Sequence, residues 1–133
     1  MAEAALERAV GFRAYHHYRR SDWSEERNRE AFGAVADPHA HDYVVTITVR
    51  GTIDPHGFVV DLRALDALLD ERIRSLEGSD LNARVFPDGG IQPSTEALAR
   101  WAWEQLAHRI PAPARLVSVR VAESATLAAE YRG

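Results

Sequence analysis

Alternating apolar and polar positions predict two strands in the first half of the chain and two near its end. Residues 10–18, VGFRAYHHY, place Val10, Phe12, Ala14 and His16 on one face, because side chains two residues apart in a strand point the same way. Residues 41–51, HDYVVTITVRG, alternate in the same manner. Residues 114–124 and 126–132 repeat the pattern near the end of the chain.

Two helices are predicted between these strand pairs. Apolar side chains recur at helical spacing after Asp61, a residue suited to an N-cap; they are Leu62, Leu65, Leu69, Ile73 and Leu76. Ser94 can cap a second helix over residues 95–110, which Pro111 closes. Residues 21–35 are predicted to be a loop with a short helical turn, and residues 77–93 a loop. The order strand, strand, helix, helix, strand, strand predicts an α+β fold: a four-stranded antiparallel sheet with both helices on one face.

Composition limits what this fold can do. The chain has 133 residues, 46% of them hydrophobic, which predicts a single domain over residues 1–133. Its net charge of −4 comes without a basic stripe and argues against nucleic acid as a partner. The absence of cysteine excludes disulfides, thiolate zinc sites and a cysteine nucleophile. No signal peptide or membrane span is recognisable, so a cytoplasmic protein is expected.

Three histidines are candidate metal ligands. His39 and His41 lie two residues apart at the start of the second strand, and His16 continues the apolar face of the first. If the two strands pair, three imidazoles converge on the helix-covered face. Three imidazoles with an open fourth position suit zinc, whereas magnesium and calcium prefer oxygen ligands. The alternative is that these are partly buried rings bonded to the backbone.

A carboxylate and a helix start are candidate substrate-binding groups. Glu123 continues the apolar row of the third strand, and an unpaired carboxylate there costs several kcal/mol unless the strand end is open to water. Its two oxygens suit a ligand edge with adjacent N–H donors. Ser94, Thr95 and Glu96 begin the second helix, where ordinary capping and ligand binding are both open interpretations.

Several motifs together resemble the 6-pyruvoyltetrahydropterin synthase and 6-carboxytetrahydropterin synthase family, which has the tunnelling fold. FRAYH resembles the family's F-S-A-x-H and HAHDY its H-G-H-N-Y, and the resemblance assigns zinc to His16, His39 and His41. GTIDPHGFVVDL, PSTEAL and VRVAES…YRG resemble further family segments, and the resemblance makes Glu123 the pterin anchor. It also implies trimeric rings that stack as a homohexamer, with active sites between subunits, so that Glu123 can serve a zinc held by a neighbouring chain.

The proton-transfer residues of the family are altered. Val35 stands at the position of the family's cysteine, and Glu77 and Gly78 stand at the positions of its Asp-His pair. A valine side chain carries no proton, and general acid–base groups usually contribute about 10²–10⁴-fold each. Asp37, Glu77 and Asp80 are therefore the candidate replacement acid–base groups.

The leading hypothesis is a zinc-dependent lyase, cyclase or isomerase of altered specificity that acts on a small polar, pterin-like or other metabolite. Its setting in this hypothesis is specialised biosynthesis. One alternative is an ordinary pterin synthase with replacement proton carriers. The other is a non-catalytic ligand-binding homologue that kept the fold.

Overall fold

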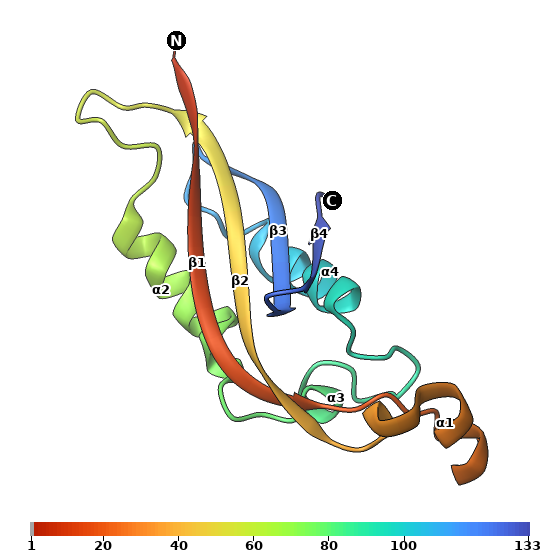
Figure 1. Cartoon of the computed structure of the whole chain (residues 1–133). Helices are drawn as coiled ribbons and strands as arrows, with labels where there is room; N and C mark the ends of the chain where they lie inside the picture. The colour runs from red at the N-terminus through yellow and green to blue at the C-terminus, as the bar shows by residue number, and fades with distance from the viewer. Residues whose placement is uncertain (1) are drawn as a thin grey trace.

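The computed structural model describes residues 2–133 and contains one antiparallel sheet with the strand order β1-β2-β3-β4. Two long strands form one half of the sheet and two shorter strands the other (Figure 1). The strands are β1 (Glu3–His16), β2 (His39–Thr52), β3 (Arg115–Ser124) and β4 (Leu127–Tyr131). This sheet confirms the predicted antiparallel α+β fold.

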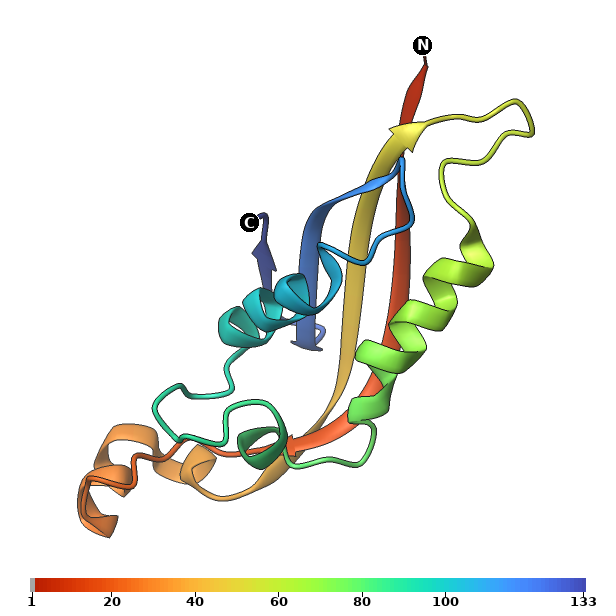
Figure 2. The ribbon, with the colours of Figure 1, turned by 180° about the vertical axis from the view of Figure 1, so that it is seen from behind.

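The two predicted helices cover one face of the sheet, as the view from behind shows (Figure 2). The helices of the structure are α1 (Glu25–Phe32), α2 (Leu62–Arg72), α3 (Leu81–Arg84) and α4 (Thr95–Leu106). Asp61 and Ser94 cap α2 and α4 as predicted, because their side chains accept backbone N–H groups of the first turn. No helix within residues 2–133 is long and apolar enough to cross a membrane.

The core lies between the sheet and these helices. Alternate residues of β2, from Tyr43 to Val49, are at most 2% exposed and pack against the apolar stripes of α2 and α4. Leu65, Leu69, Ile73 and Leu76 of the predicted stripe are buried, whereas Leu62 remains 41% exposed at the start of α2. Burial of one sheet face fixes which residues of each strand point toward the helices.

Three local predictions were incomplete. β1 begins at Glu3, seven positions before the predicted start. The prediction began too late because the first part of the strand is mostly exposed and lacks an apolar alternation. The polar segment predicted as a loop with a short helical turn contains the two-turn helix α1, in which Asn28 is the buried residue and Ser24 the N-cap. The predicted loop of residues 77–93 contains α3, a single turn capped by Asp80.

Candidate metal centre

Pairing of β1 with β2 brings the three histidines together at the end of the sheet next to α1 and α3 (Figure 1). His16 and His39 are direct register partners, and His41 lies two residues further along β2 on the same face. Their ring centroids are 4.5–5.0 Å apart. Each ring offers one nitrogen such that the three ligand atoms lie within 4.8 Å of one another.

His16 is held in one orientation and one tautomer. Its ring is 1% exposed, and Nδ1 lies 2.8 Å from the carbonyl oxygen of Pro93. A carbonyl oxygen only accepts, so Nδ1 carries the proton and Nε2 presents a lone pair. Burial lowers the pKa of His16 to about 4, which keeps the ring neutral near neutral pH. Nε2 is buried and has no hydrogen-bond partner in the described chain.

His39 is fixed in the same way. Its Nδ1 lies 2.8 Å from the carbonyl oxygen of Asp37, so this ring also turns Nε2 toward the cluster. A backbone carbonyl that accepts the Nδ1 proton is the usual outer partner of a metal-binding histidine. His41 is more accessible than His16, with its side chain 25% exposed.

Glu123 joins the cluster from β3. Its Oε2 lies 3.4 Å from His41 Nε2 and 3.6 Å from His16 Nε2, and the side chain is 9% exposed. Oε2 is buried and receives no hydrogen bond from the described residues. These neighbours belong to the same chain, so Glu123 reaches the histidines without a second subunit.

The donor set fits a zinc ion. Three imidazoles with one ring nitrogen each close together are a common protein ligand set for catalytic zinc, and they leave further coordination open. A zinc ion would also account for the buried, unpartnered His16 Nε2, since such an atom otherwise costs free energy. Magnesium and calcium fit poorly, because a set of nitrogen donors is not what hard cations select. His16, His39 and His41 are therefore the residues that would hold the metal.

A cavity of about 610 Å³ opens beside this cluster. It forms where β2 and β3 separate, because their register pairing ends at Val44 and Ala122. His41 and Glu123 line one side of it, and Arg13, Asp42 and Arg120 line another. A small polar molecule in this cavity can therefore contact His41 and Glu123 together.

Two tyrosines complete the surroundings and were not singled out from the sequence. Tyr43 is 1% exposed, and its hydroxyl lies 3.1 Å from His16 Nδ1. Burial, followed by the nearby charges of Glu123 and Glu96, raises the pKa of Tyr18 to about 12. Tyr18 therefore keeps its proton and can donate a hydrogen bond. Each tyrosine lies two residues after a candidate ligand, and this alternation could have identified both.

The three predicted acid–base residues have other partners. Asp37 forms a two-point ion pair with Arg29, at 2.6 and 2.8 Å. Glu77 accepts the backbone N–H of Arg13, and Asp80 caps α3 through the backbone N–H of Asn82. Within residues 2–133, no hydrogen bond or ion pair joins these carboxylates to the histidine rings. Their catalytic role remains a prediction, and Glu123 is the carboxylate that the fold brings to the cluster.

The two positions that the motif resemblance assigns to the family's proton-transfer set have distinct environments. Val35 is 37% exposed in the 3₁₀ turn Gly33–Ala36, which follows α1. Gly78 has a φ of 76°, a left-handed conformation that favours glycine, and its N–H bonds to the carbonyl of Arg13. A histidine at Gly78 would therefore be strained in this backbone.

The start of α4 lies against the cluster through Pro93, which holds His16. Ser94 accepts the N–H of Ala97 at 3.2 Å and so acts as the cap. Thr95 is buried and donates its hydroxyl to Glu96 Oε1 at 2.6 Å. Glu96 is exposed, so its carboxylate remains available to a ligand near Tyr18.

An antiparallel sheet with helices on one face and three clustered imidazoles at one end defines a class of small α+β proteins with a candidate metal site. Within that class, the chain belongs to the 6-pyruvoyl tetrahydropterin synthase family, whose model matches residues 5–133. The 6-pyruvoyl tetrahydrobiopterin synthase of Poecilia reticulata is 33% identical over 132 residues, covering 96% of this chain and 89% of the relative. The family membership predicted from the motifs is confirmed.

Solved structures agree with this assignment. The 6-pyruvoyl tetrahydropterin synthase of Caenorhabditis elegans has a TM-score of 0.88 and 26% identity, covering 100% of this chain and 97% of that one. A cysteine variant of the Plasmodium vivax enzyme, in which the replaced glutamate is described as a catalytic residue, has a TM-score of 0.69. It is 17% identical, covers 98% of each chain and shows the shared fold alone.

Proposed function

We propose that this chain is a zinc-dependent lyase for a small pterin-type metabolite, in which a carboxylate moves the proton that a thiol would otherwise move. The family consists of pterin synthases, which are lyases. The observation that carries the proposal is the buried Oε2 of Glu123, which lies within 3.6 Å of two imidazole nitrogens and receives no hydrogen bond in the described chain.

The metal would supply one part of the chemistry. When bound, zinc polarises a hydroxyl or carbonyl oxygen of the substrate and makes neighbouring C–H protons more acidic. His16, His39 and His41 would hold it, since their Nε2 atoms are oriented by carbonyl oxygens or point to the cluster.

Glu123 has the position of a proton acceptor. Its Oε2 is nearly buried beside the His16 and His41 imidazoles and receives no hydrogen bond from the described residues, so it is free to accept a proton from a substrate held there. Tyr18, which keeps its proton, is the hydrogen-bond donor on the same side of the cluster. The catalytic glutamate of the Plasmodium vivax enzyme supports the idea that a carboxylate can serve in this fold.

The substrate would lie in the cavity that His41 and Glu123 line. Ser94, Thr95 and Glu96 begin α4 and do not line this cavity, so their contact with the substrate stays a prediction from the sequence. A carboxylate such as that of Glu96 or Glu123 can accept two adjacent N–H groups of a pterin edge. The two carboxylates can thus divide anchoring and proton transfer between them.

A second candidate function is a lyase, cyclase or isomerase of altered specificity. The observation that favours it is Val35, which cannot carry a proton at the position of the family's cysteine. Selection could keep the metal ligands and Glu123 for a different reaction of a similar substrate. A non-catalytic ligand-binding protein is the remaining possibility, with the same metal ligands and no turnover.

One assay separates the three. Zinc-loaded protein is incubated with dihydroneopterin triphosphate, and both binding and product formation are followed. Turnover that disappears in Glu123→Gln supports the first candidate. Binding of zinc without pterin affinity supports altered specificity, and pterin binding without turnover supports the binding protein.

We also infer that the chain assembles with copies of itself. The sheet order leaves β1 and β4 as open edges, and unpaired strand edges are normally covered in stable proteins. Trimeric rings stacked into a hexamer would cover both edges. Sedimentation of the purified protein tests this, and a stable monomer would contradict it.

A further inference from the structure

The rings of His16 and His39 are each oriented by a backbone carbonyl oxygen, and the two carbonyls belong to segments that are far apart in the sequence. Pro93, at the entry to α4, accepts the Nδ1 proton of His16 at 2.8 Å. Asp37, just before β2, accepts the Nδ1 proton of His39 at 2.8 Å. The angle between the two rings therefore depends on how these two segments sit relative to each other.

The Pro93 segment is tied to the stretch of chain that follows β1 by the side chain of the preceding residue, Gln92. The Oε1 atom of Gln92 accepts the backbone N–H of Arg19 at 2.8 Å, and its Nε2 donates to the carbonyl of Arg19 at 3.0 Å. This two-point contact joins the chain beside Pro93 to the backbone of Arg19. It uses both hydrogen-bonding groups of the amide side chain, so it fixes orientation as well as distance.

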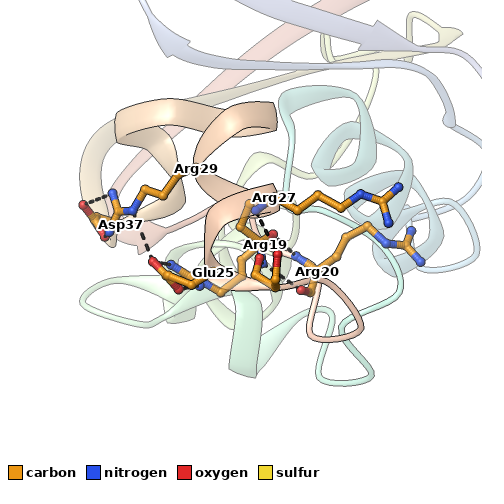
Figure 3. Close-up of polar contacts among 8 residues, drawn as sticks. Arg19, Arg20, Glu25, Arg27, Arg29 and Asp37 are labelled. Carbon is orange, nitrogen blue, oxygen red and sulfur yellow. Dashed lines mark hydrogen bonds and ion pairs between the residues drawn. The ribbon is translucent and has the colours of Figure 1, made fainter.

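The Asp37 segment is tied to the same residue by a chain of alternating charges (Figure 3). The guanidinium of Arg19 pairs with Glu25, and Glu25 Oε1 accepts Arg29 Nε at 3.2 Å. Arg29 then reaches Asp37 with two nitrogens, at 2.6 and 2.8 Å. Arg29 thus stands between the carboxylates of Glu25 and Asp37.

We propose that this polar brace, formed by Gln92, Arg19, Glu25, Arg29 and Asp37, positions His16 and His39 for metal binding. It rests on the proposed function, because it concerns the same metal centre. The brace connects the two carbonyl acceptors through the Gln92 side chain, the Arg19 backbone and side chain, and the side chains of Glu25, Arg29 and Asp37, none of which is a proposed metal ligand, so its members are positioning residues. It also assigns the side chain of Asp37 a role away from proton transfer, in contact with Arg29.

The competing explanation is that these are ordinary surface ion pairs. Isolated exposed pairs contribute little, but paired two-point geometry within a network is the case in which they matter. The chain contains a matched pair for comparison: Arg8 also reaches a carboxylate with two nitrogens, both at 2.8 Å to Asp66. The side chains of that pair are 44% and 39% exposed, against 45% and 56% for Arg29 and Asp37.

The test uses Arg29→Gln, Asp37→Asn and the double variant, with Arg8→Gln as the matched control. Zinc affinity is measured by competition with a chelator. The geometry of the metal ligands is followed through the visible absorption of the cobalt-substituted protein, and the stability of the metal-free protein through thermal unfolding. Asp37→Asn keeps the backbone carbonyl and removes only the charge. The double variant shows whether the two residues act through one interaction.

The brace predicts that Arg29→Gln and Asp37→Asn each weaken zinc binding by roughly tenfold, the lower end for loss of an outer partner of a metal ligand. The cobalt spectrum should change in both variants. The double variant should lose no more zinc affinity than either single variant, and Arg8→Gln should bind zinc as tightly as the unaltered chain. Unchanged affinity and spectrum in Arg29→Gln would overturn the brace and leave the metal centre standing. An equal loss of zinc affinity in Arg8→Gln would also overturn the brace, since the loss would then come from a general decrease in protein stability. A failure of the unaltered chain to bind zinc would instead overturn the proposed function itself.

Discussion

The two ends of the long β1–β2 ribbon each carry a cavity. Among residues 2–133, buried polar side-chain atoms without a hydrogen-bond partner lie beside the cavity at the histidine end. The cavity at the histidine end measures about 610 Å³, and the one at the opposite end, near Phe58 and Pro113, about 510 Å³. At the opposite end, Asp54 accepts backbone N–H groups of His56 and Phe58, and Asp61 caps α2. At the histidine end, Glu123 Oε2 and His16 Nε2 are buried without such partners.

The two cavities have similar volumes, so volume does not identify the site. What differs is whether the polar groups at each end already have hydrogen-bond partners within the chain. Carboxylates that accept backbone N–H groups hold a turn or a helix start in place. A buried carboxylate and a buried imidazole nitrogen without partners cost free energy, and a ligand can recover it. By this criterion the histidine end is the candidate functional site.

The largest expected effect comes from removing a metal ligand. His39→Ala should abolish specific zinc binding, because two imidazoles and one carboxylate cannot hold the ion as tightly as the full set. Loss should exceed the roughly 10–100-fold that loss of an outer partner costs. Chelator competition measures it, and His17→Ala is the control, since that residue lies beside the cluster without belonging to it. Equal zinc affinity in His39→Ala would contradict the ligand assignment.

The next effect concerns Glu123. Glu123→Gln should keep zinc bound and lower turnover of the substrate by about 10²–10⁴-fold, the usual contribution of an acid–base group. The matched control is Glu130→Gln on β4, whose carboxylate faces Arg132 at the surface. Steady-state kinetics with measured metal content checks both variants. Full activity in Glu123→Gln would assign the proton transfer to another group.

Sequence patterns predicted most of the fold because one face of each strand and helix is buried. Tyr43, Val45 and Ile47 of β2 alternate as a half-buried strand must, and the Asp61 and Ser94 caps carry their own local signal. The length of α1 was underestimated as a short helical turn, because a helix with a single buried residue, Asn28, has no apolar stripe. Its stability comes from the Ser24 cap and ion pairs, which a hydrophobic pattern does not record.

The site was predictable in part. The H-x-H pair and its strand register follow from alternation, so the three histidines could be grouped from the sequence. The contact of Glu123 with His16 and His41 depends on where β2 and β3 separate, which alternation does not specify. Gln92 and Pro93 reach the site from a loop, and loop geometry leaves no periodic trace.

A pair of helix caps sharpens the comparison further. Asp61→Ala and Ser94→Ala should each lower the free energy of unfolding by about 1 kcal/mol, the typical value for losing an N-cap. Only Ser94→Ala should also weaken zinc binding, because Ser94 follows the carbonyl of Pro93 that holds His16. Thermal unfolding and chelator competition are measured on both. Equal zinc affinity in the two variants would show that the α4 cap does not affect the metal centre.

The smallest expected effect lies at the opposite end. Phe58 is 62% exposed, so Phe58→Ala should change the free energy of unfolding by no more than about 0.5 kcal/mol. Zinc affinity and turnover should be unchanged, because Phe58 lines a cavity with Thr52, at the end of the β1–β2 pair opposite to His16 and His39. Denaturant unfolding and the same activity assay check it. A loss of turnover would make that cavity part of the function.

The most direct test of the metal centre is a crystal structure of the zinc-loaded protein with anomalous data collected at the zinc edge. The account predicts one strong peak per chain, about 2.0–2.1 Å from the Nε2 atoms of His16, His39 and His41. A map without a peak among these rings, from protein loaded with zinc, would contradict it.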